Sequence, residues 1–167
     1  MKKYIIFTTI AVCVIFFDQY SKFLLLTKML PYESIPVIDG FFNIVSIRNP
    51  GAAFGIFASF PLSWRMPLFI GVAILATAFI IYSLLEMGDE DKRTPVALSL
   101  IFAGMVGNTT DRLRFGEVID FIDCYIGSWH WPAFNIADSA LSLGAFLLLF
   151  IILKSNRRDG EKERVKA

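Results

Sequence analysis

Charged residues, histidine and cysteine are all scarce in this sequence. Charged residues make up 19% of the 167 positions and hydrophobic residues 56%, with only two cysteines and one histidine. About a quarter of the residues of a soluble domain are charged, so a soluble protein is excluded. Basic and acidic residues number 16 and 15, for a net charge of +1. No basic surface for nucleic acid is therefore expected.

The shortage of metal-binding side chains makes a zinc centre hard to assemble. Cys13 and Cys124 do not form a Cys-x-x-Cys pair, and His130 is the single histidine. A structural zinc ion needs four ligands of this kind. We therefore predict chemistry that uses no metal and no cofactor.

Long apolar runs are what the sequence does contain. Four runs are long enough to cross a membrane as helices, and they cover residues 4–26, 67–85, 95–113 and 135–154. The first run imitates a cleavable signal peptide but continues past Asp18 to Leu26, so we predict a helix that stays attached. The predicted fold class is an α-helical integral membrane protein with four transmembrane helices.

Residues 27–65, between the first two runs, differ in kind. Their prolines exclude one continuous helix, and apolar residues alternate at positions 37–47 around a turn near Asp39 and Gly40. We predict a small extracytoplasmic β-sheet here and an extracytoplasmic loop at residues 114–134. Residues 1–154 would then form a single membrane domain, followed by a basic cytoplasmic tail at residues 155–167.

Lysines and arginines predict the orientation in the membrane. They gather at the N-terminus, at residues 86–95 and after the last run, so these three segments should face the cytoplasm. Both larger connections then lie on the outer side. This topology brings four acids from different segments together at the outer face, namely Asp18, Asp111, Asp120 and Asp138.

Acids among apolar neighbours must be paired, protonated or functional. Asp18 and Lys22 have the i,i+4 spacing of an ion pair, which could be structural or could brace a polar site. Asp120 has no basic residue within two positions, and burial would raise the pKa of such an acid. Asp138 could cap a helix together with Asn135 or take part in catalysis.

Two further acids are better explained without catalysis. Asp111 is next to Arg112, which favours a structural network of charge-assisted hydrogen bonds. Asp123 is interpreted as a solvated charge in the second loop. We expect the replacement of Asp123 by asparagine to be tolerated.

Five polar blocks of the chain resemble, in order, the motif blocks of bacterial lipoprotein signal peptidase, signal peptidase II. They are DQYSK (residues 18–22), RNPGAAFG (48–55), GNTTDR (107–112), GEVIDF (116–121) and FNIADSA (134–140). Five blocks at compatible positions make the resemblance highly specific. Its departures concern packing: Pro50 stands where many relatives have threonine, and Thr109 and Thr110 replace commoner apolar residues.

The resemblance implies an aspartic endopeptidase of the bacterial inner membrane. Such an enzyme removes signal peptides from diacylglyceryl-modified prolipoproteins on the N-terminal side of the lipidated cysteine. The family's catalytic pair maps to Asp120 and Asp138. The residues that shape or brace the site map to Asn49, Gly51, Asn108, Asp111, Arg112 and Asn135. The implied partners are the lipid-modified prolipoprotein and membrane lipids, around a monomer whose active site lies near the outer leaflet.

Two functions of other classes remain open. A small proton-coupled transporter or channel could use the four aspartates as a relay, although residues 67–85 and the inner halves of the third and fourth runs carry no acids. A non-catalytic scaffold or lipid-binding protein would keep the fold and lose nothing on Asp120→Asn. Within the peptidase hypothesis, the sequence does not decide which aspartate is the base.

Overall fold

The computed structural model describes residues 1–52 and 55–166, with side chains described as far as residue 155. Within these residues the chain forms four helices and four strands. The helices are α1 (Lys2–Lys28), α2 (Leu62–Glu86), α3 (Arg93–Phe115) and α4 (Ile136–Lys166). The strands are β1 (Ser34–Ile38), β2 (Phe42–Asn49), β3 (Val118–Ile126) and β4 (Trp129–His130).

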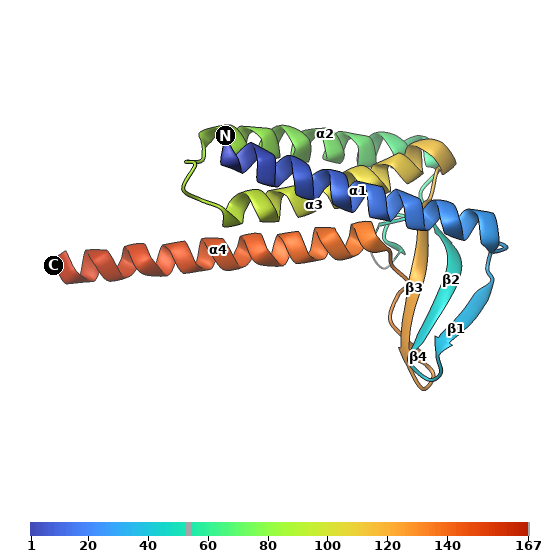
Figure 1. Cartoon of the computed structure of the whole chain (residues 1–167). Helices are drawn as coiled ribbons and strands as arrows, with labels where there is room; N and C mark the ends of the chain where they lie inside the picture. The colour runs from blue at the N-terminus through green and yellow to red at the C-terminus, as the bar shows by residue number, and fades with distance from the viewer. Residues whose placement is uncertain (53–54, 167) are drawn as a thin grey trace.

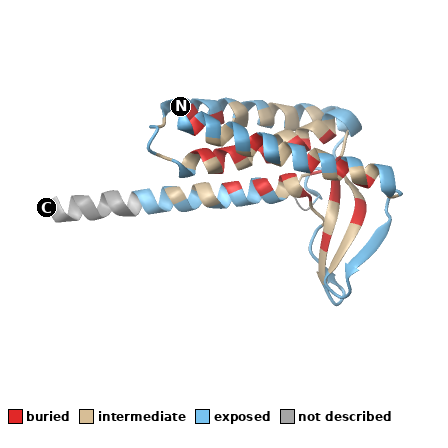
Figure 2. Cartoon of the chain, viewed as in Figure 1, coloured by how far each residue is buried: buried red, intermediate tan, exposed pale blue. Residues whose placement is uncertain are grey.

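The helices form a bundle that carries the sheet at one end (Figure 1). Both ends of the chain lie at the other end of the bundle, away from the sheet. Helix α3 is central, because it contacts α1, α2 and α4. Figure 2 shows the result, with buried positions concentrated along α3 and where the helices meet β2 and β3. The described part of α2, by contrast, buries only Ile80 and Leu84.

Three helices have the length and composition to cross a membrane. They are α1, α2 and the part of α4 from Ile136 to Ser155. Large apolar side chains point outward from them, such as Val72, Leu75 and Phe146, which are 57%, 72% and 70% exposed. Lipid tails cover apolar helix surfaces of this kind. The prediction of a helical membrane protein is therefore confirmed for these three helices.

Helix α3 differs because its second half is polar. Residues 108–112 are all polar or charged, and α3, although within the described residues, does not meet the criterion that the other three helices meet. Its central place explains how the polar residues are tolerated, since Asn108 and Asp111 are buried against protein and not against lipid. The fourth membrane crossing remains a prediction.

Glycines allow α4 to approach α3 closely. A Cβ on Gly104 would lie 2.3 Å from the carbonyl oxygen of Ala137, and a Cβ on Gly107 would lie 2.6 Å from Asp18 Oδ2. A Cβ on Gly144 of α4 would likewise lie 2.8 Å from a carbonyl oxygen of α3. Membrane helices associate through such close packing because lipid removes the hydrophobic drive between them. The first turn of α4 is thereby fixed against both α3 and α1.

The sheet has the strand order β1-β2-β3-β4, and every neighbouring pair is antiparallel. The predicted turn joins β1 to β2, where Gly40 has a φ of +78° that favours glycine. The segment predicted as a loop at residues 114–134 contains two strands that the sequence did not predict, because it supplies β3 and β4. The main partner of β3 is β2, far away in the sequence, and such pairing leaves little trace in a local pattern.

The helix ends also differ from the apolar runs. α2 begins at Leu62, directly after Pro61, so Pro67 lies in its second turn and not in the first turn as the run 67–85 predicted. The residues of α2 that precede the apolar run extend the helix into the interfacial region, beyond the part that faces lipid. α4 continues to Lys166, through the segment predicted as a tail, and the side chains of that segment lie outside the described residues.

Candidate active site

Antiparallel contacts bring the two predicted catalytic acids to one place. Ile122 of β3 forms an isolated bridge with Phe134, two residues before α4 begins. The carbonyl oxygen of Phe134 accepts the N–H groups of Phe121 and Ile122 at 3.0 and 2.8 Å. This bridge joins the strand that carries Asp120 to the helix that carries Asp138. Both acids line the same cavity.

Asn135 contacts both acids. Its side-chain Nδ2 donates to Asp120 Oδ1 at 2.8 Å, and its backbone N–H donates to Asp138 Oδ2 at 3.2 Å. Its Oδ1 accepts the backbone N–H of Asp138 at 2.8 Å, which completes the reciprocal helix cap that the sequence predicted. Capping and a place beside Asp120 are therefore not alternatives for Asp138, because the same asparagine provides both.

Two more asparagines complete the hydrogen bonding of the acids. Asn49 Nδ2, at the end of β2, donates to Asp120 Oδ2 at 3.0 Å. Asn108 Nδ2 of α3 donates to Asp138 Oδ1 at 2.7 Å. Each of the four carboxylate oxygens thus accepts a bond from an asparagine N–H. A carboxylate oxygen has two lone pairs, so each can accept a further bond from water or substrate.

Asp120 combines this hydrogen bonding with an apolar setting. Burial, followed by the neighbouring charge of Asp138, raises the pKa of Asp120 to about 6, although bonds from Asn49 and Asn135 oppose the rise. The side chain can therefore hold a proton close to neutral pH. Two adjacent carboxyl groups that differ in protonation can supply both a general base and a general acid.

The turn after β2 is held in place from α3. Asn49 Oδ1 accepts the N–H of Gly51 at 2.9 Å, and the Gly51 carbonyl oxygen accepts a bond from Arg112 Nη2 at 2.7 Å. A Cβ on Gly51 would lie 2.5 Å from the carbonyl oxygen of Ile56, so the turn requires glycine. Residues 53–54 of the RNPGAAFG block lie outside the described residues.

Three of the predicted supporting residues lie behind the acids. Lys22 Nζ lies 2.9 Å from Asp18 Oδ2 and 2.7 Å from Asp111 Oδ2, and all three side chains are at most 2% exposed. The predicted ion pair of Asp18 and Lys22 is confirmed. The network predicted for Asp111 uses Lys22 and not its neighbour Arg112, whose guanidinium donates to backbone carbonyl groups.

The cavity over the acids has a volume of about 940 Å³. Its walls combine polar groups such as Asn108 and Arg112 with apolar side chains of α2 and α4, such as Val72 and Leu141. A peptide group and an apolar segment can therefore occupy the same cavity. Within residues 1–52 and 55–166, no three His, Cys, Asp or Glu side chains come together in a way that could hold a metal ion.

The motifs, the site and the fold agree with one family. A sequence profile described as signal peptidase (SPase) II matches residues 10–154. The chain belongs to the signal peptidase II family. It is 47% identical over 161 residues to a lipoprotein signal peptidase of Syntrophus aciditrophicus (strain SB), with 96% of this chain and 98% of that protein covered. A lipoprotein signal peptidase of Geobacter sulfurreducens (strain ATCC 51573 / DSM 12127 / PCA) is 44% identical over 155 residues, with 93% and 96% covered.

A solved structure agrees with the sequence relatives. This signal peptidase II chain superposes on a bacterial membrane enzyme, determined by the in meso method at 2.3 Å resolution, with a TM-score of 0.81. The two are 41% identical, and the match covers 90% of this chain and 88% of that one. The family membership predicted from the five motif blocks is therefore confirmed.

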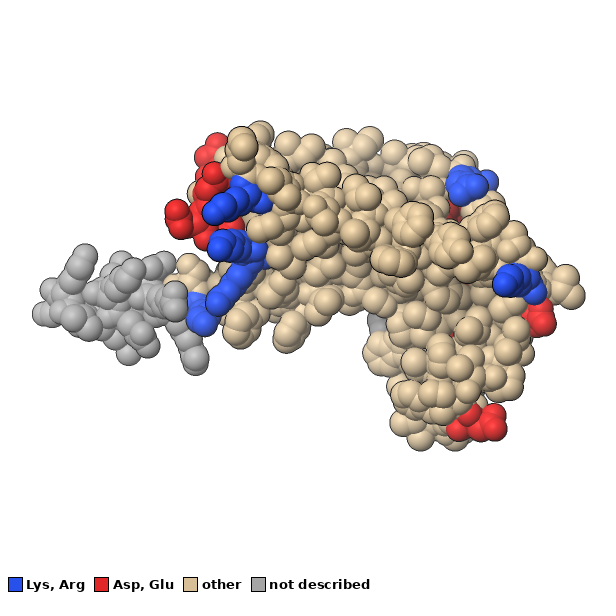
Figure 3. Space-filling model, viewed as in Figure 1, with Lys and Arg blue, Asp and Glu red and all other residues tan. Residues whose placement is uncertain are grey.

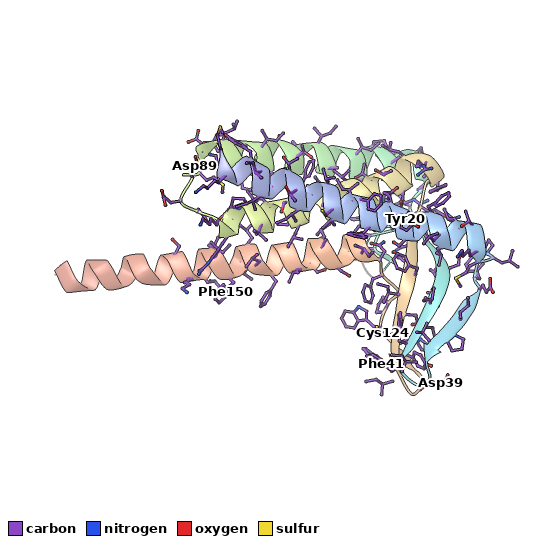
Figure 4. All side chains as sticks on the ribbon, viewed as in Figure 1. Tyr20, Asp39, Phe41, Asp89, Cys124 and Phe150 are labelled. Atoms are coloured by element: carbon purple, nitrogen blue, oxygen red, sulfur yellow. The ribbon has the colours of Figure 1, made fainter. Side chains whose placement is uncertain are left out.

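One acid of this signal peptidase II chain was wrongly interpreted from the sequence. Asp123 is not a solvated loop charge, since only 7% of the residue is exposed. It accepts a hydrogen bond from Asn43 Nδ2 at 2.9 Å and lies 2.8 Å from His130 Nδ1. Pairing of β2 with β3 places Asn43 opposite Asp123, and β4 brings the histidine. Other acids do face solvent, such as Asp39 at the tip of the sheet and Asp89 at the far end of the bundle (Figure 4).

Sequence reasoning missed two residues of this family member's polar centre. Gln19 Nε2 donates to Asp18 Oδ2 at 3.1 Å and to Asp111 Oδ1 at 3.0 Å. A glutamine inside an apolar run was a signal, because such a side chain seeks a partner on a neighbouring helix. Gly107, whose missing side chain makes room for Asp18, left no comparable signal, because glycines such as Gly71 also occur within apolar helices where their Cβ position faces open space.

Proposed function

We propose that this peptidase uses Asp120 and Asp138 as an aspartic dyad. It removes signal peptides from diacylglyceryl-modified prolipoproteins, cutting on the N-terminal side of the lipidated cysteine. The observation that carries the proposal is Asn135, which hydrogen-bonds both carboxyl groups beside one cavity. The relatives reported above, all lipoprotein signal peptidases, support the choice of substrate.

In this mechanism the two acids start in different protonation states. The ionised aspartate takes a proton from a water molecule while the water oxygen bonds to the carbon of the scissile carbonyl group. The protonated aspartate donates to the carbonyl oxygen and stabilises the charge that develops there. When the C–N bond breaks, the leaving nitrogen takes a proton from the dyad, and an acid and an amine are released. Asn49, Asn108 and Asn135 hold the carboxyl groups in position throughout.

The surface of the protein supports a site at the outer membrane face. Figure 3 shows charged side chains gathered at the end of the bundle where the chain begins, followed by a long surface with few charges. We propose four crossings, including α3, in the bacterial inner membrane, with both termini in the cytoplasm and one domain over residues 1–154. The sheet and the dyad then lie at the outer leaflet, where the acyl chains of the substrate stay in lipid. The active unit is a monomer.

The transporter alternative finds no support in the comparisons, which assign the chain to a peptidase family. The arrangement of acids argues in the same direction. Among the described residues, the buried acids are Asp18, Asp111, Asp120 and Asp123, and all four belong to the region where α1 and α3 meet β3. A proton relay would need further acids toward the cytoplasmic end.

The proposed activity is tested directly by incubating the purified protein with a lipidated prolipoprotein and measuring the products by mass spectrometry. We expect two fragments, with the lipidated cysteine as the new N-terminal residue. The same precursor without its diacylglyceryl group serves as the matched control and should be cleaved far more slowly. Cleavage at any other bond, or equal cleavage of both precursors, would contradict the assigned specificity.

The proposed topology predicts where reporters become accessible. Fusions or single cysteines after residues 45, 90, 125 and 160 should report outside, inside, outside and inside, because basic residues flank the inner connections. Labelling of intact and permeabilised cells measures this. A position 125 that reports inside would separate the sheet from the outer face and refute the arrangement.

A further inference from the structure

A bridge of three buried charges lies behind the proposed dyad. We call Asp18, Lys22 and Asp111 the ion bridge, since the ammonium group of Lys22 lies between the two carboxylates at 2.9 and 2.7 Å. Burying a lysine and two acids costs solvation energy that the attraction between them only partly returns. Apolar side chains of similar volume are often as stabilising as a buried group of this kind. Stability alone therefore does not explain the positions of these charges.

Each acid of the ion bridge also holds a peptide group next to a member of the dyad. Asp18 Oδ1 accepts the backbone N–H of Ala137 at 2.9 Å, directly before Asp138. Asp111 Oδ2 accepts the backbone N–H of Ile119 at 3.2 Å, directly before Asp120 in the chain. The two ends of the ion bridge thus anchor the two chain segments that carry the dyad, and Lys22 joins these anchors.

The third contact of Lys22 reaches the dyad through an amide. An ammonium group has three N–H donors, and the third points to Asn108 Oδ1 at 3.4 Å. The same oxygen accepts Asn135 Nδ2 at 3.3 Å. With two donors facing its oxygen, the Asn108 amide must turn its own N–H group the other way, where it donates to Asp138 Oδ1 at 2.7 Å. A flipped amide would lose this bond and place its N–H beside a cation.

We infer that Lys22 is a positioning residue for the dyad. Through the ion bridge it sets the spacing of the two segments that carry the catalytic acids, and through Asn108 it fixes the donor that faces one of them. This inference rests on the proposed aspartic mechanism and extends it to residues that do not touch the substrate. None of the three residues of the ion bridge lines the cavity.

The charge of Lys22 also acts on the dyad at a distance. The charged groups around it are Asp18 on its own helix, Asp111 on α3, Asp120 on β3 and Asp138 on α4. Arg112 of α3 also acts on Asp111, Asp120 and Asp138. Within this set the lysine opposes the effect of burial and lowers the pKa of Asp120. Its positive charge therefore favours the singly ionised dyad that the mechanism requires.

Two variants separate positioning from stability. Asp18→Asn removes one negative charge but keeps an oxygen for the Ala137 N–H. Asp18→Asn with Lys22→Met removes one acid and the cation together, so the net charge of the buried group is unchanged and Asp111 keeps its bonds from Gln19 and the Ile119 N–H. We expect kcat of the double variant to fall about ten- to a hundredfold, since small misplacements of catalytic groups cost this much. KM should stay within about twofold, because neither side chain lines the cavity.

The pH–rate profile is the readout that a purely structural role would not move. In Asp18→Asn the acidic limb should shift to lower pH, because loss of a negative charge favours the ionised dyad. Adding Lys22→Met should move the limb back to higher pH. Asp89→Asn, at an exposed acid near the far end of the bundle, is the control and should leave kcat and the profile unchanged.

The outcomes distinguish this inference from the mechanism on which it rests. If Asp120→Asn is inactive while the folded double variant keeps the kcat and pH profile of the unaltered protein, the dyad stands and Lys22 has no positioning role. If Asp120→Asn remains active, the aspartic mechanism and the positioning role of Lys22 are both refuted. If the double variant does not fold, Asp18→Asn decides alone: an unchanged kcat and an unmoved acidic limb overturn the inference, and a shifted limb supports it.

Discussion

Asp120→Asn and Asp138→Asn should each reduce cleavage of the lipidated substrate about a thousandfold or more, because a dyad fails as a unit. Asparagine keeps the size of the side chain and a hydrogen-bond acceptor but cannot take or give the proton that the reaction moves. At position 138 the new amide oxygen can still accept the Asn135 N–H, so the helix cap survives. Turnover of lipidated precursor by purified variants in detergent measures the effect.

Asp123→Asn is the matched control for this experiment. Asp123 lies on the same strand as Asp120, is also buried and also accepts a bond from an asparagine of β2. It does not line the cavity, so its replacement should leave turnover nearly unchanged. The variant with both Asp120 and Asp138 replaced should be scarcely slower than either single variant. Substantial turnover by a well-folded Asp138→Asn protein would mean that Asp138 caps the helix and takes no part in catalysis.

Relative to its parent, the inactive Asp120→Asn protein should gain stability as the pH rises from about 4 to about 8. Burial raises the pKa of Asp120 to about 6 in the folded protein, so the folded state binds the proton more tightly than the unfolded chain does. Stability is then lost as pH rises from the ordinary acid range through about 6, and it stays lower above that. Asparagine removes this penalty, which amounts to roughly 1 to 3 kcal/mol.

Thermal unfolding in detergent at two pH values measures this effect. The gain in Tm of Asp120→Asn should be large at about pH 8 and small at about pH 4, where the unaltered acid is already protonated. An equal gain at both values would mean that the carboxylate is not destabilising. The measurement also shows that the loss of activity does not arise from misfolding.

Gly104→Ala should impair both folding and catalysis, although it adds only one methyl group. That methyl would lie 2.3 Å from the carbonyl oxygen of Ala137, a backbone atom directly before Asp138. Helix α4 would have to move away from α3 and take the acid with it. We expect a loss of about 1 to 3 kcal/mol of stability and a fall in kcat of more than about tenfold.

Gly71→Ala provides the matched control within another helix. Nothing lies within 4 Å of a Cβ at this position, so the added methyl group displaces no atom. Alanine favours the helix by about 0.5 to 1 kcal/mol relative to glycine, and Tm should rise slightly with unchanged turnover. Equal behaviour of the two variants would show that close contact of α3 with α4 is not what positions Asp138.

Most features of the site that depend on local pattern could be predicted from the sequence. Apolar runs gave the membrane helices, and the spacing from Asn135 to Asp138 gave the helix cap, because both depend on neighbours in the chain. The topology alone placed Asp18, Asp111 and Asp120 at one end of the bundle. What failed was pairing between distant segments, as in β3 and in the contacts of Asp123, since register depends on a partner strand elsewhere.

The contacts of Lys22 show the same difference between local contacts, which the sequence predicts, and contacts between distant segments, which it does not. Its pairing with Asp18 follows from helical spacing and was predicted. Its contact with Asp111 depends on how closely α1 approaches α3, which Gly107 permits by lacking a side chain. No pattern within either helix encodes that distance. How closely two helices pack depends on both of their surfaces together, and the sequence pattern of one helix does not describe the surface of the other.

The bridge between Ile122 and Phe134 has a consequence for how the protein is made. One acid of the proposed dyad lies on β3, whose partner β2 is synthesised before it, whereas the other lies on α4, which is synthesised after both strands. A nascent chain that has not yet inserted α4 therefore carries only one of the two proposed catalytic acids. If these two acids form the dyad, such a chain cannot cleave neighbouring membrane proteins, because activity requires α4 in place beside β3.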